Sequence, residues 1–96
     1  MKMPKLVLSI AGTDATGCAG VMADLKSFHS CGVYGMAAIT SIVAQNTLGV
    51  QSIHNLETSW VQEQLDSVFD DELPHDIKTG MIATKETLEL IQSYLK

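Results

Sequence analysis

The nearly continuous apolar run from Lys5 to Ala11 constrains the fold more than any other segment of this 96-residue chain. Ser9 is the only polar residue inside the run, and Gly12 ends it. A short apolar run that ends at a glycine is typical of a strand buried on both faces, as in a parallel sheet. Parallel sheets are covered by helices on both faces. The first strand therefore predicts an α/β fold.

The next two patterns continue this alternation of strands and helices. After a glycine-punctuated loop, Val21, Leu25 and Phe28 recur at helical spacing, and Gly32 suits the end of that helix. Apolar and β-branched residues over 36–44 then favour a second strand. Residues 45–57 are mixed and polar, so we predict a loop there with one short strand near 50–53.

The second half of the chain predicts two more helices around a short strand. Ser59 and Gln62 fit a capping box at the start of one helix. A strand over 76–81 follows an acidic turn, and Thr84 is the expected cap of the last helix. The last helix is expected to bury one apolar stripe: Leu88, Ile91 and Leu95.

The predicted order is therefore β-α-β-(loop)-α-β-α. Strands that alternate with helices imply right-handed crossovers and a parallel sheet covered on both sides. We predict an α/β fold in which residues 1–96 form a single parallel-sheet βαβαβα piece of a larger three-layer domain. The last helix runs to Lys96 without a capping glycine, so we expect the domain to be incomplete. A sheet of three strands leaves an edge open, which favours a homo-oligomer.

Composition excludes several classes of partner. The net charge is −5 and all six basic residues are lysines, so no basic face is available for nucleic acid. No apolar run approaches the roughly 20 residues that cross a bilayer, and we expect no membrane partner. Cys18 and Cys31 have neither redox nor metal-ligand spacing. The three histidines share no ligand spacing either, so we predict a cytoplasmic protein without a metal site of its own.

The loop over 12–20 begins and ends with glycine and has a third glycine at 17. Gly12 and Gly17 satisfy the spacing of a phosphate-binding P-loop, but Cys18 stands where its lysine is needed. The loop therefore either lets the backbone approach a ligand before a helix or only makes a tight turn. Asp14 inside it is expected to make an Asx turn, although it could bind a hydroxyl group.

Gln45 follows the second predicted strand, and ligands of open α/β sheets bind beyond the carboxyl ends of strands. Its carboxamide offers a donor and an acceptor side by side, which match the edge of an aminopyrimidine. The alternative, a glutamine that caps a strand end, is favoured by spacing alone. Asp24 allows two interpretations as well: a buried carboxylate that faces a ligand, or the commoner solvated helix residue.

Taken together, several segments closely resemble the hydroxymethylpyrimidine/phosphomethylpyrimidine kinases of thiamine biosynthesis, in the ribokinase superfamily. The opening glycine loop with its following helix and the Ala44-Gln45-Asn46-Thr47 block are the most specific matches. The matching segments cover nearly the whole chain: residues 9–14, 19–26, 32–36, 42–51, 64–69 and 77–81.

This resemblance implies a function for individual residues. Family members bind the hydroxymethylpyrimidine ring through the residue that matches Gln45, while residues that match Gly12, Asp24, Val43 and Met81 close the pocket. The intact enzyme would use ATP and Mg²⁺ to phosphorylate hydroxymethylpyrimidine and then its monophosphate. The resemblance therefore moves our interpretation of Gln45 from strand cap to pyrimidine reader.

The sequence departs from the family in ways that bear on activity. The family's later Gly-Thr-Gly-Cys anion-hole motif and its ATP-binding segments have no counterpart in these residues. Because that motif stabilises the charge on the transferred phosphoryl group, we expect no catalytic residue in this chain and no turnover by it alone. Ala15 and Cys18 also replace the usual proline and glycine, and Cys18 adds bulk near the ligand.

Two alternatives stay open at this point. The chain could be the matching piece of a kinase for pyridoxal or pyridoxine, although the block around Gln45 favours the pyrimidine. It could also be a non-catalytic module that binds a pyrimidine or assembles through its open edge.

Overall fold

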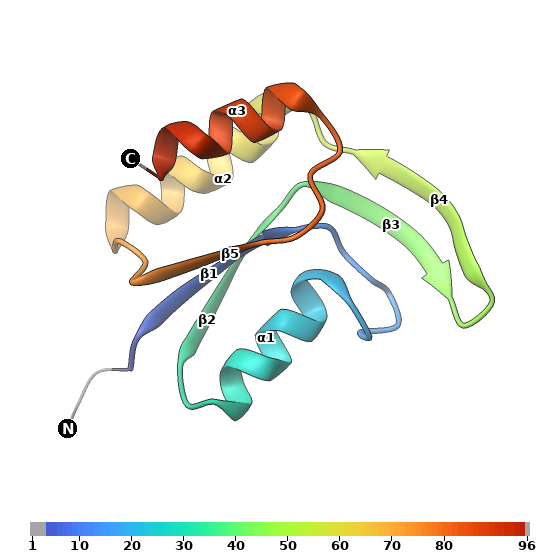
Figure 1. The fold of residues 1–96 in the computed structure, drawn as a ribbon, viewed down its shortest axis with the longest axis horizontal. Coiled ribbons are helices and arrows are strands. Elements are labelled where there is room, and N and C mark those ends of the chain that lie inside the picture. The colour runs from blue at the N-terminus through green and yellow to red at the C-terminus, as the bar shows by residue number, and fades with distance from the viewer. Residues whose placement is uncertain (1–3, 96) are drawn as a thin grey trace.

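A parallel sheet forms the middle layer of the computed structural model, which describes residues 4–95 (Figure 1). Its strands are β1 (Leu6–Ala11), β2 (Tyr34–Ile39) and β5 (Asp76–Thr79), in the order β2-β1-β5. β1 pairs in parallel with both neighbours, which leaves β2 and β5 as the outer strands. The predicted parallel sheet of three strands is therefore confirmed.

Helices cover both faces of this sheet (Figure 1). α1 (Gly20–Ser30) packs against β1 and β2 on one face, while α2 (Thr58–Asp71) and α3 (Lys85–Tyr94) lie together on the other. This arrangement confirms the predicted three-layer α/β fold. Among the described residues, no helix is long and apolar enough to cross a membrane.

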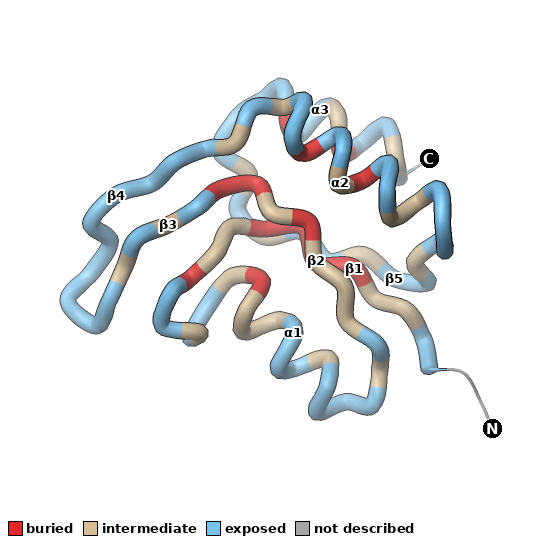
Figure 2. The backbone as a smooth tube through the Cα atoms, turned by 180° about the vertical axis from the view of Figure 1, so that it is seen from behind, coloured by how far each residue is buried: buried red, intermediate tan, exposed pale blue. Residues whose placement is uncertain are grey.

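The hydrophobic core lies between the sheet and the pair α2 and α3, where Figure 2 shows buried segments facing one another. Alternate residues of β1, Leu8 and Ile10, point into it and are fully buried. Residues of a strand alternate between faces, so Ser9 points to the α1 side, where it is also fully buried. The core is completed from β2, α2 and α3: Ala38, Val61, Leu65 and Ile91.

The second predicted strand is wrong in its extent. The chain bends at Thr40, where β2 ends, and β3 (Ser41–Asn46) then pairs antiparallel with β4 (Gly49–Asn55) as a separate hairpin. Most of the predicted loop over 45–57 is therefore strand. No glycine or proline marks the bend, and β3 continues the apolar pattern, so composition alone could not show where the chain leaves one sheet for another.

Two helix starts and one helix end were predicted, and one of the two starts and the end are confirmed. Thr84 caps α3 as expected, since its hydroxyl accepts a hydrogen bond from the backbone N–H of Thr87. The capping box is wrong: α2 begins at Thr58 with Glu57 as the cap residue, and no side chain completes the cap. Gly32 follows α1 with a positive φ of 75°, as a helix-ending glycine should.

The predicted stripe on α3 is wrong in two of its three members. Ile91 is buried, but Leu88 and Leu95 are 44% and 51% exposed. The helix instead buries Thr87 one turn before Ile91 and packs Leu90 and Tyr94 partly against the core. The stripe is rotated around the helix because α3 packs beside α2, while Ile91 joins the core with Leu8 and Ile10 of β1.

Candidate functional site

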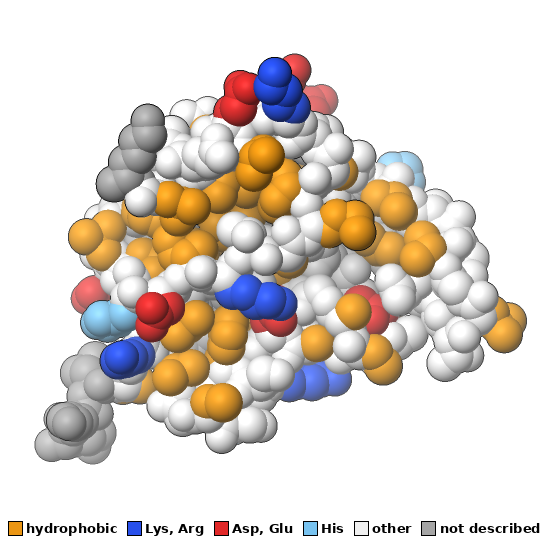
Figure 3. Space-filling model, in the orientation of Figure 1, with side chains coloured by type: hydrophobic (Ala, Val, Ile, Leu, Met, Phe, Trp, Pro, Cys, Tyr) orange, Lys and Arg blue, Asp and Glu red, His pale blue; other side chains and the backbone are white. Residues whose placement is uncertain are grey.

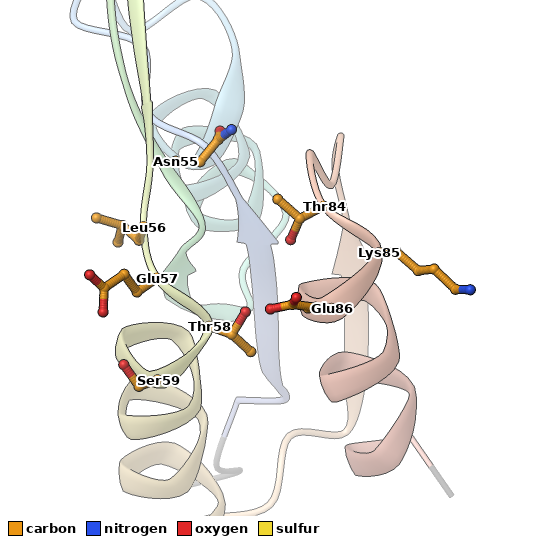
Figure 4. A pocket seen from close by; sticks show the side chains of 8 residues that line it. All are labelled: Asn55, Leu56, Glu57, Thr58, Ser59, Thr84, Lys85 and Glu86. Carbon is orange, nitrogen blue, oxygen red and sulfur yellow. The ribbon is translucent and has the colours of Figure 1, made fainter.

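One hollow lies between the first turns of α2 and α3, with a volume of about 570 Å³ (Figure 4). Glu86 points across it toward α2, whereas Lys85 and Glu57 point away from it. A carboxylate directed into the hollow disfavours an anionic ligand there. None of the site residues predicted from the sequence lines it; its lining residues are Asn55, Leu56, Glu57, Thr58, Ser59, Thr84, Lys85 and Glu86.

The second hollow, which we name the strand-end cavity, lies where the ends of β1 and β5 meet the hairpin. Its volume of about 360 Å³ is within the range of small-molecule sites. Four of the five predicted site residues line it: Gly12, Val43, Gln45 and Met81. The remaining lining residues are Ala11, Thr13, Ala19, Gly20, Ser41, Val50, Ile53, Asn55, Lys78, Gly80 and Ala83.

The loop between β1 and α1 forms one wall of the cavity through close backbone contacts. Gly20 adopts a positive φ of 63°, and a Cβ atom there would lie 2.3 Å from the carbonyl oxygen of Gly12. That carbonyl accepts a hydrogen bond from the N–H of Val21 at 2.9 Å. A side chain at position 20 would break this contact, so glycine is required here for the approach of the loop to its helix.

Asp14 organises the same loop from within. Its carboxylate accepts hydrogen bonds from the N–H and hydroxyl of Thr16 at 2.9 and 2.8 Å, and from the N–H of Cys18 at 3.1 Å. The hydrogen bond from the Thr16 backbone is the main reason that the pKa of Asp14 lies below its ordinary value, although desolvation opposes it. Asp14 therefore makes the expected Asx-type turn, and its carboxylate faces its own loop.

The hairpin forms the opposite wall. In β3 alternate residues point inward: Ser41 is buried and Val43 and Gln45 are half-buried, while their neighbours are exposed. The loop and the hairpin are joined directly, since Thr13 donates its N–H to the carbonyl of Ser41 and accepts from the N–H of Val43 at 3.0 Å. The two walls therefore hold a fixed position relative to each other.

The structure changes the surroundings expected for Gln45. The carboxamide does not sit at the end of a strand in the parallel sheet, as the sequence suggested, but within a hairpin strand that faces the cavity. Met81 lies at the rim, where it is 89% exposed. Gln45 and Met81 nevertheless border the same cavity, although they are distant in the sequence.

Asp24 is the predicted site residue that the structure does not bring to the cavity wall. Its Oδ1 atom lies 2.6 Å from the ammonium group of Lys78, and its Oδ2 accepts a hydrogen bond from the hydroxyl of Ser9 at 2.7 Å. Burial opposes ionisation of Asp24, but the hydrogen bonds from Lys78 and Ser9 outweigh it and hold its pKa below the ordinary value. Asp24 is thus ionised and fully engaged at neutral pH.

Sequence reasoning missed Lys78, which lines the cavity and pairs with Asp24. A usable signal was present: Lys78 follows Ile77 in a strand where alternate residues face opposite sides. Ile77 packs against the core, so the next residue had to face α1. On the face of the molecule in Figure 3, lysine side chains are scattered singly.

The described residues that line the strand-end cavity include no Cys, His, Asp or Glu side chain. Among residues 4–95, no group of three or more His, Cys, Asp or Glu side chains could hold a metal ion. Cys18 is exposed and does not line the cavity, so its bulk lies outside the cavity wall. The cavity is therefore lined by amide, hydroxyl, backbone and lysine groups together with apolar side chains.

Comparison with protein families identifies the chain. The model of the family described as phosphomethylpyrimidine kinase matches residues 14–96, which include most of the cavity's lining. The chain belongs to this family. A hydroxymethylpyrimidine/phosphomethylpyrimidine kinase of Staphylococcus aureus is 75% identical over 95 residues, which cover 99% of this chain and 34% of that enzyme. The chain therefore spans about a third of the length of such curated relatives.

Solved structures support the same fold for this phosphomethylpyrimidine kinase family member. The phosphomethylpyrimidine kinase of Clostridium difficile 630 matches with a TM-score of 0.91 and 42% identity, over 95% of this chain and 39% of that one. A pyridoxal kinase from Staphylococcus aureus in complex with AMP-PCP and pyridoxal matches with a TM-score of 0.89 and 34% identity, over 98% and 35%. The predicted family and ribokinase-like fold are confirmed.

Proposed function

We propose that this chain supplies the pyrimidine-binding part of a hydroxymethylpyrimidine/phosphomethylpyrimidine kinase. The observation that carries the proposal is that the Gln45 carboxamide borders one cavity together with Gly12, Val43 and Met81. An aminopyrimidine presents an amino donor beside a ring-nitrogen acceptor, and a carboxamide satisfies both at once. Residues of the cavity that are apolar, Val43 and Met81 among them, would contact the faces of the ring.

The intact enzyme would transfer a phosphoryl group from ATP to hydroxymethylpyrimidine and then to its monophosphate, in thiamine biosynthesis in the cytoplasm. Mg²⁺ and the triphosphate do not fit the residues described here, because they include neither a metal-ligand cluster nor a P-loop lysine in the glycine loop. We therefore assign no step of phosphoryl transfer to this chain. Residues 1–96 would act as one N-terminal piece of the kinase domain and would not turn over ATP alone.

Binding by the 96-residue chain tests the role of Gln45. Isothermal titration with hydroxymethylpyrimidine should show binding that falls roughly tenfold to a hundredfold in Gln45→Leu, since a bidentate amide contact contributes about 1–3 kcal/mol. Gln62→Leu is the matched control, because Gln62 is exposed on α2 and is not among the residues that line the cavity. Equal affinity in the wild type and Gln45→Leu would refute the proposed role.

A second candidate substrate is pyridoxal, because a pyridoxal kinase complexed with pyridoxal shares this fold over 98% of the chain. Competition between hydroxymethylpyrimidine and pyridoxal in the same titration separates the two. Preference for pyridoxal would favour the pyridoxal kinase alternative. Sustained ATP consumption that depends on substrate would contradict the proposed inactivity of the isolated chain.

Self-association through an open sheet edge stays a proposal. β2 and β5 are the outer strands, but Gln64 already occupies backbone groups of Ile39 at the end of β2, with both hydrogen bonds at 2.8 Å. The freer candidate is therefore β5. Sedimentation velocity over a range of concentrations would detect such a homo-oligomer.

A further inference from the structure

Lys78 is the only charged residue among the described residues that line the strand-end cavity. The other lining residues carry apolar side chains, hydroxyl groups, carboxamides or no side chain beyond Cβ. The Asp24 carboxylate that pairs with Lys78 is not part of the lining, so the cavity itself presents the ammonium group, which favours a ligand that carries negative charge at that point. The neutral pyrimidine ring has no charge to pair with the Lys78 ammonium group. The phosphorylated substrate of the proposed function has a negatively charged phosphate group that could pair with it.

The ammonium group of Lys78 is held in place by Asp24, whose carboxylate is in turn held by Ser9. Ser9 and Lys78 are paired residues of β1 and β5, and both face α1, which contributes Asp24. Asp24 contacts Lys78 at 2.6 Å and Ser9 at 2.7 Å, and the Asp24 side chain is only 13% exposed. A long lysine side chain that is free in solution loses considerable conformational entropy when it binds a ligand. Because Asp24 already restrains Lys78, this entropy cost of binding is smaller.

The ion pair leaves Lys78 able to bind another group. An ammonium group has three donors, and Asp24 accepts one of them. The Lys78 side chain is 53% exposed, so the remaining donors are open to the cavity and to solvent. A half-exposed ion pair contributes little to stability, so stability alone gives a weak reason for a lysine at this position.

We propose that Lys78, positioned by Asp24 and Ser9, binds the phosphate group of a phosphorylated pyrimidine in the strand-end cavity and so distinguishes the monophosphate from the free alcohol. The proposal rests on the proposed function, because Gln45 would bind the ring of the same ligand. The phosphate is carried by the hydroxymethyl group, next to the ring amino group, so ring and phosphate recognition belong to one cavity. Asp24 is then a positioning residue that acts through Lys78.

The test compares the affinities of the 96-residue chain for hydroxymethylpyrimidine and for its monophosphate. Lys78→Met should weaken binding of the monophosphate about tenfold, the size expected for loss of a charged hydrogen bond, and leave binding of the alcohol unchanged. Lys78→Arg keeps the charge and should retain most of the affinity, which guards against a variant that fails to fold. The preference for the monophosphate should also fall as salt is added.

Lys26→Met is the matched control. Lys26 lies on α1, where it donates to the carbonyl of Gly17 in the glycine loop at 3.1 Å, but it does not line the cavity. This variant should bind both ligands as the wild type does. The positioning role of Asp24 is tested in the double variant Asp24→Asn/Lys78→Met, which should lose no monophosphate affinity beyond that lost by Lys78→Met.

The outcomes separate this inference from the function on which it rests. If Lys78→Met weakens the binding of both ligands equally, the proposed role of Lys78 is overturned and the pyrimidine site is not. The same conclusion follows if Lys26→Met and Lys78→Met have equal effects on the binding of the monophosphate. Lys78→Met could instead weaken the binding of ATP and leave the binding of the monophosphate unchanged. That result would show that Lys78 binds the phosphates of ATP, and it would also overturn the proposed role of Lys78. Failure to bind either pyrimidine would overturn both proposals.

Discussion

The two sheets of this molecule differ sharply in burial. Residues Leu8 to Ala11 of β1 are buried without interruption, whereas every residue of β4 is exposed. The parallel sheet lies between helices, and the hairpin has helices on neither side (Figure 1). Burial on both faces makes β1 a nearly continuous apolar run, with Ser9 as its one polar residue. We infer that the parallel sheet carries most of the stability, while the hairpin contributes mainly contacts within the cavity.

Two glutamines illustrate the same difference. Gln64 on α2 binds the backbone of Ile39 through both its donor and its acceptor, each at 2.8 Å. Its carboxamide thus matches the polar edge of a peptide and ties α2 to the end of β2. Gln45 on the hairpin borders the cavity. The first carboxamide joins α2 to the sheet, and we propose that the second binds a ligand with the same pair of groups.

The largest expected effect on stability comes from shortening a buried side chain in β1, the central strand of the parallel sheet. Leu8→Ala should lower the free energy of unfolding by about 3 kcal/mol, because it removes a fully buried side chain from the core. Leu48→Ala in the hairpin turn, where the leucine is 91% exposed, should change it by less than about 0.5 kcal/mol. Urea unfolding measures both. Similar losses in the two variants would contradict the assignment of stability to the parallel sheet.

A smaller effect is expected where the two regions meet. Gly20→Ala should cost about 2–3 kcal/mol, because it combines a positive φ with a Cβ placed 2.3 Å from the Gly12 carbonyl oxygen. Gly32→Ala has a similar φ but no atom within 4 Å, and should cost only about 1 kcal/mol. Thermal unfolding of both variants separates strain in φ from the steric contact. Equal costs would show that the contact relaxes freely.

The smallest effect on global stability is expected within the hairpin turn. Asn46 accepts a hydrogen bond from the N–H of Leu48 at 2.8 Å, so Asn46→Ala should loosen the turn. Because β4 is exposed, global stability should change by less than about 0.5 kcal/mol, while amide exchange in β3 and β4 becomes faster. Hydrogen exchange followed by NMR measures this directly. Exchange in β4 as slow as in β1 would show instead that the hairpin unfolds only with the sheet.

Local patterns were sufficient to predict most elements of the fold but not their exact edges. The apolar run of β1, the glycine after α1 and the Thr84 cap each depend on neighbours in the chain, and each prediction is confirmed. The bend at Thr40 depends on contacts with Ala11 and Leu56, which are distant in sequence. The rotated stripe of α3 likewise depends on its packing against α2.

Sequence by itself determined that this chain forms an α/β layer structure and that it resembles pyrimidine kinases, and through that resemblance it predicted Gln45 as the side chain that would bind an aminopyrimidine. Only the tertiary structure decided that Gln45 stands on a hairpin and that Asp24 faces Lys78, 54 positions away in the chain. The physical reason is that periodicity and helix caps arise from interactions within a few residues. The pairing of charges and the walls of a cavity arise only when distant strands are brought side by side.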